Sequence, residues 1–149
     1  MEFLIKSLPI ELKNHILAYL YNTQPFNLCN DIKSYRIISI KAKDIYNSYW
    51  KKNPDIAKDW LINDTIRFVN EDVPTMYGFQ NFYKTVIKRH FNCNYLSEEE
   101  VNQTISRLED NSCCKDSNIF KIILGLLLPE ERTNLLEFYN KIYSRRYTF

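Results

Sequence analysis

Apolar side chains recur every three or four residues along several stretches of the chain, which is the spacing of one buried helix face. Two such stripes are Tyr35, Ile38, Ala42, Ile45 and Tyr49, and Phe79, Phe82, Tyr83, Val86 and Ile87. Only two glycines and five prolines leave little material for the tight hairpins of a β-rich fold. The pattern predicts an all-α fold, a single compact domain of six or seven helices over residues 1–149.

Capping signals and polar segments mark where the predicted helices begin and end. The segment Asn53-Pro54-Asp55 combines an N-cap residue, a proline suited to the first turn and an acid that complements the helix dipole. Ser97 and Glu100 form a capping box, a strong start signal for the helix that follows. The second helix is expected over residues 31–52. Loops are predicted over residues 22–30, 70–75 and 109–116.

The segment 118–128 is apolar on nearly every side, so it predicts a helix in the centre of the core. Gly125 within it costs about 1 kcal/mol relative to alanine, and we expect it to permit a close helix crossing. A last helix begins at Leu128-Pro129-Glu130-Glu131. Its inward face is predicted to contain Leu135, Leu136, Phe138, Tyr139, Ile142 and Tyr143.

Residues 7–21 predict a helix with apolar side chains on two faces. Ser7 can cap its start, and Pro9 fits its first turn. One face holds Leu8, Leu12, Ile16, Tyr19 and Leu20, and a nearly opposite face holds Ile10, Leu17 and Tyr21. A helix that covers a single core needs one stripe, so we expect the second face to contact another part of the chain or a partner.

This segment resembles the opening of an F-box, a family that begins with Leu-Pro-x-Glu-(Leu/Ile) followed by Ile and Leu at helical spacing. The matching positions are Leu8, Pro9, Glu11, Leu12, Ile16 and Leu20. The resemblance extends over residues 8–51, because Trp50-Lys51 stands about where an F-box ends. In style the chain is also similar to proteins of large DNA viruses of eukaryotes.

The resemblance implies a subregion over residues 1–52 that binds a Skp1-type adaptor. The helical remainder, residues 53–149, would then recognise a target for a cullin-based ubiquitin ligase. The alternative is an ordinary N-terminal helix that has a proline in its first turn and packs on its own core.

The charge is nearly balanced, with a formal net charge of +2 and both signs spread along the chain. A non-specific nucleic-acid binder has a stronger electrostatic footprint, so nucleic acid is not the expected partner. No apolar run approaches the ~20 residues of a membrane span, and the N-terminus lacks the features of a signal peptide. We therefore expect no membrane contact and an intracellular location, cytoplasmic or nuclear (in the host cell for a viral protein), with reduced cysteines.

Patterns for catalysis and metal binding are weak. His90, Cys93 and the pair Cys113-Cys114 could supply three sulfurs and one nitrogen to zinc, but adjacent cysteines rarely ligate one ion. The chain has no glycine-rich phosphate loop, and its acidic runs are explained by helix starts. We expect a protein that is not an enzyme, with no catalytic residues, no metal and no cofactor.

The resulting hypothesis is a non-catalytic protein–protein interaction module. Its predicted partner-binding residues are Leu8, Pro9, Leu12, Ile16 and Leu20. One alternative is a structural or assembly protein, such as a virion component or a complex subunit, with no ubiquitin role. Another is a nucleic-acid-associated factor that uses a basic patch of Lys84, Lys88 and Arg89. A further basic group on the second helix, which includes Lys33, Arg36, Lys41 and Lys43, is mostly solvated and mildly favours an acidic partner.

Overall fold

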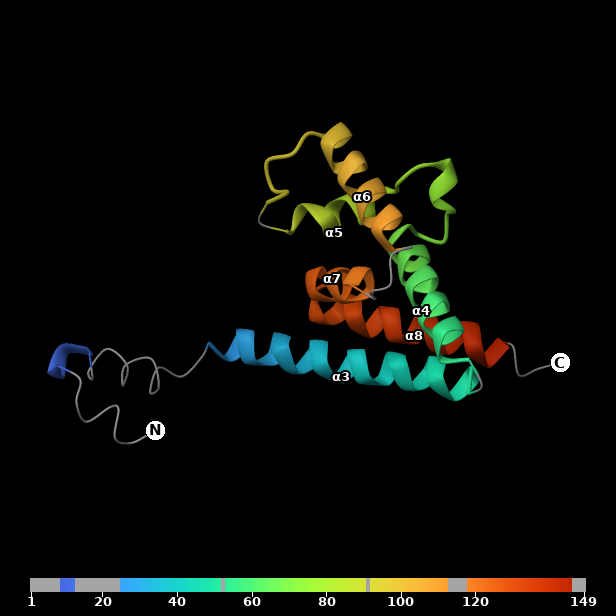
Figure 1. Ribbon diagram of the computed structural model, residues 1–149, viewed down its shortest axis with the longest axis horizontal. Helices are drawn as coiled ribbons and strands as arrows, with labels where there is room; N and C mark the ends of the chain where they lie inside the picture. The colour runs from blue at the N-terminus through green and yellow to red at the C-terminus, as the bar shows by residue number, and fades with distance from the viewer. Residues whose placement is uncertain (1–8, 13–24, 52, 91, 113–117, 146–149) are drawn as a thin grey trace. The chain divides into compact units, whose positions relative to one another are not determined.

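The computed structural model describes residues 9–12, 25–51, 53–90, 92–112 and 118–145 (Figure 1). Every regular element in this part of the chain is helical, which confirms the predicted all-α fold. The chain divides into two compact units, Met1–Ile32 and Lys33–Phe149. The predicted boundary after residue 52 therefore lies inside the second unit.

Residues 10–12 are helical, and the longer elements follow from residue 26 onward. They are α3 (Phe26–Tyr49), α4 (Pro54–Val69), the 3₁₀ helix η1 (Thr75–Tyr77), α5 (Asn81–Lys88), α6 (Glu98–Ser112), α7 (Asn118–Leu126) and α8 (Pro129–Arg145). None of the helices in the described ranges is both long enough and apolar enough to cross a membrane.

Most of the predicted helix starts are confirmed. Pro54 occupies the first turn of α4, and Asn53 is its N-cap residue, although the Asn53 side chain makes no capping hydrogen bond. The capping box of α6 is present, because the Ser97 amide donates to Glu100 Oε2 at 2.8 Å and the Glu100 amide donates to Ser97 Oγ at 3.4 Å. Hydrogen bonds from Ser97 also lower the pKa of the Glu100 carboxyl.

The predicted bounds are wrong at three helix ends. Helix α3 already begins at Phe26, because the carbonyl of Pro25 accepts the first helical hydrogen bond from the Cys29 amide at 3.1 Å. Helix α6 continues to Ser112, since polar side chains without glycine or proline do not stop a surface helix. Helix α7 ends at Leu126, two residues before the predicted end, because the residue that precedes Pro129 is disfavoured in helical conformation.

Helix α7 lies at the centre of the second unit, where it contacts α4, α5 and α6 (Figure 1). Ile119, Phe120, Ile123 and Leu124 are buried, as the apolar run predicts. The expectation for Gly125 is wrong: it is exposed, and a Cβ added there would meet no atom within 4 Å. It therefore permits no close helix crossing.

Within the second unit α3 and α8 run side by side and parallel (Figure 1). Residues later in α3 contact residues later in α8, which is the order expected of parallel helices. Arg132 lies over the Tyr35 ring, Tyr46 packs edge-on against Tyr139 with ring centroids 5.3 Å apart, and Tyr49 packs against Tyr143. This pairing buries the predicted face of α3, with Ile38 and Ala42 fully covered.

Four buried polar side chains in this core form two hydrogen-bonded pairs. Tyr46 donates its hydroxyl proton to Asp64 at 2.8 Å, and the hydroxyls of Thr65 and Tyr139 are 2.6 Å apart. Burial raises the pKa values of Tyr46 and Tyr139 above the usual tyrosine range, so both hydroxyls stay protonated. The paired groups avoid the free-energy penalty of an unsatisfied buried donor or acceptor.

Candidate protein-docking surface

The predicted partner-binding residues of the N-terminal segment are described only in part. Pro9 precedes the short helical stretch 10–12, as expected of a proline at a helix start, and both Pro9 and Leu12 are exposed. Leu8, Ile16 and Leu20 lie outside the described residues. Leu12 is not among the buried core residues. The assignment of this segment to a partner stays a prediction.

Two of the three residues of the predicted basic patch are paired with acids. The Lys84 ammonium lies 3.6 Å from the Glu98 carboxylate, and the Arg89 guanidinium binds Glu131 with two hydrogen bonds of 2.5 and 2.8 Å. Lys88 is partly buried, and no ion pair joins it to another described residue. Lys84 and Arg89 therefore form ion pairs within the fold, and the three residues do not form an open basic surface.

Arg132 lies near Arg89 at the end of α7 and is a second cation held inside the fold. Arg132 is 1% exposed. Its guanidinium donates to the carbonyls of Leu124 at 2.7 Å and Gly125 at 3.2 Å, while Arg89 donates to the carbonyl of Leu126 at 3.1 Å. These carbonyls belong to the last turn of α7, which has no further helical amides to bind. We call Arg89, Arg132 and Glu131 the α7 end cluster.

Glu131 completes this cluster and also starts α8. It accepts the two bonds from Arg89 and a third, at 2.8 Å, from the backbone amide of Leu128. Hydrogen bonding to Arg89 holds the pKa of Glu131 below its usual value, and the same bonding raises the pKa of Arg89. The Leu-Pro-x-Glu pattern occurs a second time at residues 128–131. There it begins α8, and its Glu131 is the counter-ion of Arg89.

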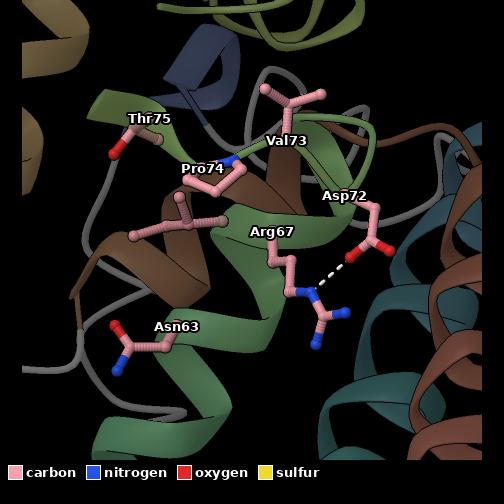
Figure 2. A pocket seen from close by; sticks show the side chains of 7 residues that line it. Asn63, Arg67, Asp72, Val73, Pro74 and Thr75 are labelled. Atoms are coloured by element: carbon pink, nitrogen blue, oxygen red, sulfur yellow. Dashed lines mark hydrogen bonds and ion pairs between the residues drawn. The ribbon is translucent and has the colours of Figure 1, made fainter. Parts of the chain in front are cut away.

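A pocket of about 280 Å³ lies at the C-terminal end of α4, lined by residues of α4 and the following loop (Figure 2). Figure 2 shows Arg67 reaching towards Asp72, with which it forms an ion pair. The charge of Arg67 is therefore already neutralised within the pocket. The pocket offers little attraction to an anionic ligand.

The loop that carries Asp72 is fixed by the buried side chain of Asn70. Its Nδ2 donates to the carbonyls of Val73 at 2.6 Å and Gly78 at 3.2 Å, and its Oδ1 accepts from the Gln80 amide at 2.8 Å. Asp72 has a φ of 64°, in the left-handed region that side-chain-bearing residues adopt at a cost. Asn70 has a structural role that explains its burial.

The predicted absence of a metal site stays a prediction. No group of three candidate metal-ligating side chains occurs among the residues that the structure describes. Cys93 is buried and His90 is partly exposed. Cys113 and Cys114 lie outside the described residues.

A different surface stands out on the side of α3 that faces away from α8. At ~100° per residue, Ile37, Ile40 and Asp44 fall on one line, roughly opposite the buried Ile38 and Ala42. Ile37 is 50% exposed and Ile40 is 51% exposed. Four exposed cations surround them: Lys33, Arg36, Lys41 and Lys43. We call these seven residues, 33, 36, 37, 40, 41, 43 and 44, the basic face of α3.

The cations of the basic face are not used inside the fold. Within the described ranges, no ion pair joins Lys33, Arg36, Lys41 or Lys43 to a carboxylate. The sequence marks these cations as solvated neighbours of the buried stripe. It gives a weaker signal for Ile37 and Ile40, whose three-residue spacing is visible but whose exposure depends on which face α8 covers.

A pocket of about 180 Å³ adjoins the basic face and is lined by α3, α4 and Phe120 of α7. Its apolar lining includes the buried residues Tyr46, Ala57, Leu61 and Phe120, and the exposed Pro54. Lys43 and Lys58, which are less buried, also line it. The surface therefore combines an exposed aliphatic stripe, a small apolar pocket and a cationic border.

In comparisons with known proteins, the chain matches no family model, and no curated protein or solved structure is significantly similar to it. The chemistry of its own residues therefore carries the inference of function.

Proposed function

We propose that the protein is a non-catalytic protein-interaction module that binds a partner through the basic face of α3 and the adjoining pocket. The observation that carries the proposal is the half exposure of both Ile37 and Ile40 in the middle of a cationic border. Protein interfaces commonly have an apolar centre that loses its water and a polar rim that stays hydrated. An exposed aliphatic pair within charged residues has that arrangement.

The double variant Ile37→Ser/Ile40→Ser tests this proposal in the full-length chain. Partners recovered from eukaryotic cells are quantified by mass spectrometry, with Met76→Ser/Tyr77→Ser as the matched control, because Met76 and Tyr77 are also exposed. We expect the partners of the wild type to be retained by the control and reduced at least about tenfold by the α3 variant. Equal retention by both variants would contradict the proposal.

We further propose that residues 8–21 form an F-box-like helix that binds a Skp1-type adaptor. Support comes from the Leu-Pro-x-Glu-Leu pattern at residues 8–12 and from the exposure of Pro9 and Leu12. On this proposal the helical remainder, residues 53–149, would select the target for a cullin ubiquitin ligase.

The double variant Leu8→Ser/Leu12→Ser tests the adaptor proposal with the purified adaptor. Loss of adaptor binding is expected while far-UV helicity and the melting temperature stay nearly unchanged. A large fall in melting temperature in the isolated protein would count against it, because the two leucines would then belong to the chain's own core.

A further inference from the structure

We infer that the basic face of α3 binds an acidic amphipathic helix of a protein partner, which lies along α3 and places one apolar side chain in the adjoining pocket. The inference rests on the proposed interaction function and gives its partner a chemical class. It follows from the shape of the surface, the sign of its charges and the position of the one carboxylate within it.

The surface has the dimensions of a single helix. From Lys33 to Asp44 and on to Asn47, which also lines the pocket, α3 rises about 20 Å at ~1.5 Å per residue. Its apolar part is a narrow stripe, Ile37 and Ile40, and an amphipathic helix presents a stripe of the same kind at positions i, i+3, i+4 and i+7. A helix laid along α3 therefore covers the stripe and leaves its polar side in water.

The charges select an acidic helix. At ~100° per residue, Arg36 and Lys43 lie on one side of the two isoleucines and Lys41 lies on the other. Carboxylates that flank the apolar stripe of a partner helix would meet these cations at the rim, where charge complementarity chiefly speeds association and sets the register. The structure describes no carboxylate of the chain paired with them.

Asp44 distinguishes a protein helix from a polyanion. It lies on the line of Ile37 and Ile40, about one turn beyond Ile40. An anionic membrane or a nucleic acid presents negative charge along its whole surface and would place it against Asp44. A helix can present a basic or neutral residue at that point and carboxylates elsewhere.

The pocket adds a second distinction. Ala57, Leu61 and Phe120 are almost fully buried, so the apolar lining is built from side chains that the core already holds in place. Such a lining suits a projecting aliphatic or aromatic side chain. Lys43 beside it favours an anchor residue next to a carboxylate.

The experiment measures fluorescence anisotropy of a labelled synthetic helix of about 18 residues, with leucine at helical spacing and glutamate on both flanks. We expect saturable binding to the full-length protein and no binding of a peptide of the same composition in scrambled order. Ile37→Ser/Ile40→Ser and Lys41→Glu/Lys43→Glu should each weaken binding at least about tenfold. The control Met76→Ser/Tyr77→Ser should bind like the wild type.

A charge exchange sharpens the test. A matching helix with lysine in place of glutamate should bind the Lys41→Glu/Lys43→Glu variant better than the wild type. Phosphatidylserine vesicles and a duplex DNA oligonucleotide are the competing probes. Binding to either one that depends on Lys41 and Lys43, without binding of the glutamate helix, would overturn the inference.

Two further outcomes overturn it while identifying another occupant. A monomer–dimer equilibrium that Ile37→Ser/Ile40→Ser abolishes would show that a second copy covers the face. A fall of more than about 5 °C in the melting temperature of that variant would show that the chain itself covers it. If the glutamate helix fails while cellular partners still depend on Ile37 and Ile40, the acidic class is wrong and the interaction function stands.

Discussion

The end of α7 and the exposed face of α3 are both rich in cations, but the two regions use them differently. In the α7 end cluster, Arg89 and Arg132 bind three backbone carbonyls and one carboxylate, and Arg132 is almost fully buried. On the basic face, Lys33, Arg36, Lys41 and Lys43 are exposed, and no ion pair links them to a described carboxylate.

The difference teaches that the partner of a cation, more than its type, decides whether it contributes to stability or to recognition. A guanidinium that satisfies buried carbonyls cannot be removed without leaving them unpaired. An exposed ammonium ion contributes little to folding and remains available to an external anion. Substitutions in the α7 end cluster should therefore lower stability, whereas substitutions on the basic face should lower partner binding and leave stability nearly unchanged. The predictions below run from the largest expected effect on stability to the smallest.

Arg132→Met should have the largest effect and lower the free energy of unfolding by about 3–5 kcal/mol, because the buried carbonyl of Leu124 and the partly buried carbonyl of Gly125 lose their donor. Denaturant melts measure this loss. Lys121→Met, on the exposed side of α7, is the control and should change the value by less than about 0.5 kcal/mol. A loss below about 1 kcal/mol for Arg132→Met would break the comparison.

Glu131→Gln should have a smaller effect that depends on pH. Because the pKa of Glu131 is lowered in the folded state, its contribution is present above the unfolded value of about 4.3 and is lost as the pH falls through the folded-state pKa. The variant should lose about 1–2 kcal/mol at pH 7 and less as the pH approaches about 3. Urea melts across this pH range measure the loss, with Glu130→Gln as control. A loss that is independent of pH would contradict the role given to the Glu131 carboxylate.

Gly125→Ala should raise the free energy of unfolding by about 0.5–1 kcal/mol, because alanine favours the helix and its Cβ has open space. Thermal melts measure the change. A destabilised variant would mean that the end of α7 needs the freedom of glycine, contrary to the exposed position seen here.

Lys41→Glu/Lys43→Glu should have the smallest effect on folding, within about 0.5 kcal/mol of the wild type in denaturant melts. The same variant is expected to lose most of its binding to the glutamate-bearing peptide helix. A loss above about 1 kcal/mol would place these lysines in the same structural class as Arg132 and remove the contrast between the regions.

Local signals predict much of this fold because they act within a few residues. The capping box of Ser97 and Glu100 and the proline of α4 mark their helices as predicted. A proline can break a helix or begin one, and the predicted loop over residues 22–30 is wrong because Pro25 directly precedes the first residue of α3. The buried stripe of α3 follows from spacing alone.

The two cationic regions could not be separated from the sequence. Arg132 is polar and lies on a helix with an apolar stripe, so its burial depends on the end of α7 meeting the start of α8. Ile37 and Ile38 are adjacent and chemically identical, yet one is half exposed and the other buried, because α8 packs on a single side of α3. Of the predicted site residues, Arg89 and Lys84 have internal partners for the same reason, a tertiary contact.

The parallel pairing of α3 with α8 also sets a delay in the synthesis of the protein. Tyr46 packs against Tyr139, and at roughly 5–20 residues per second the roughly 90 residues between them take several seconds to emerge from the ribosome. Until then the aromatic side of α3 has no α8 to cover it, and such transiently open apolar surface is what chaperones recognise and what aggregation exploits. The packing of α3 against α8 can form only after α8 has left the ribosome.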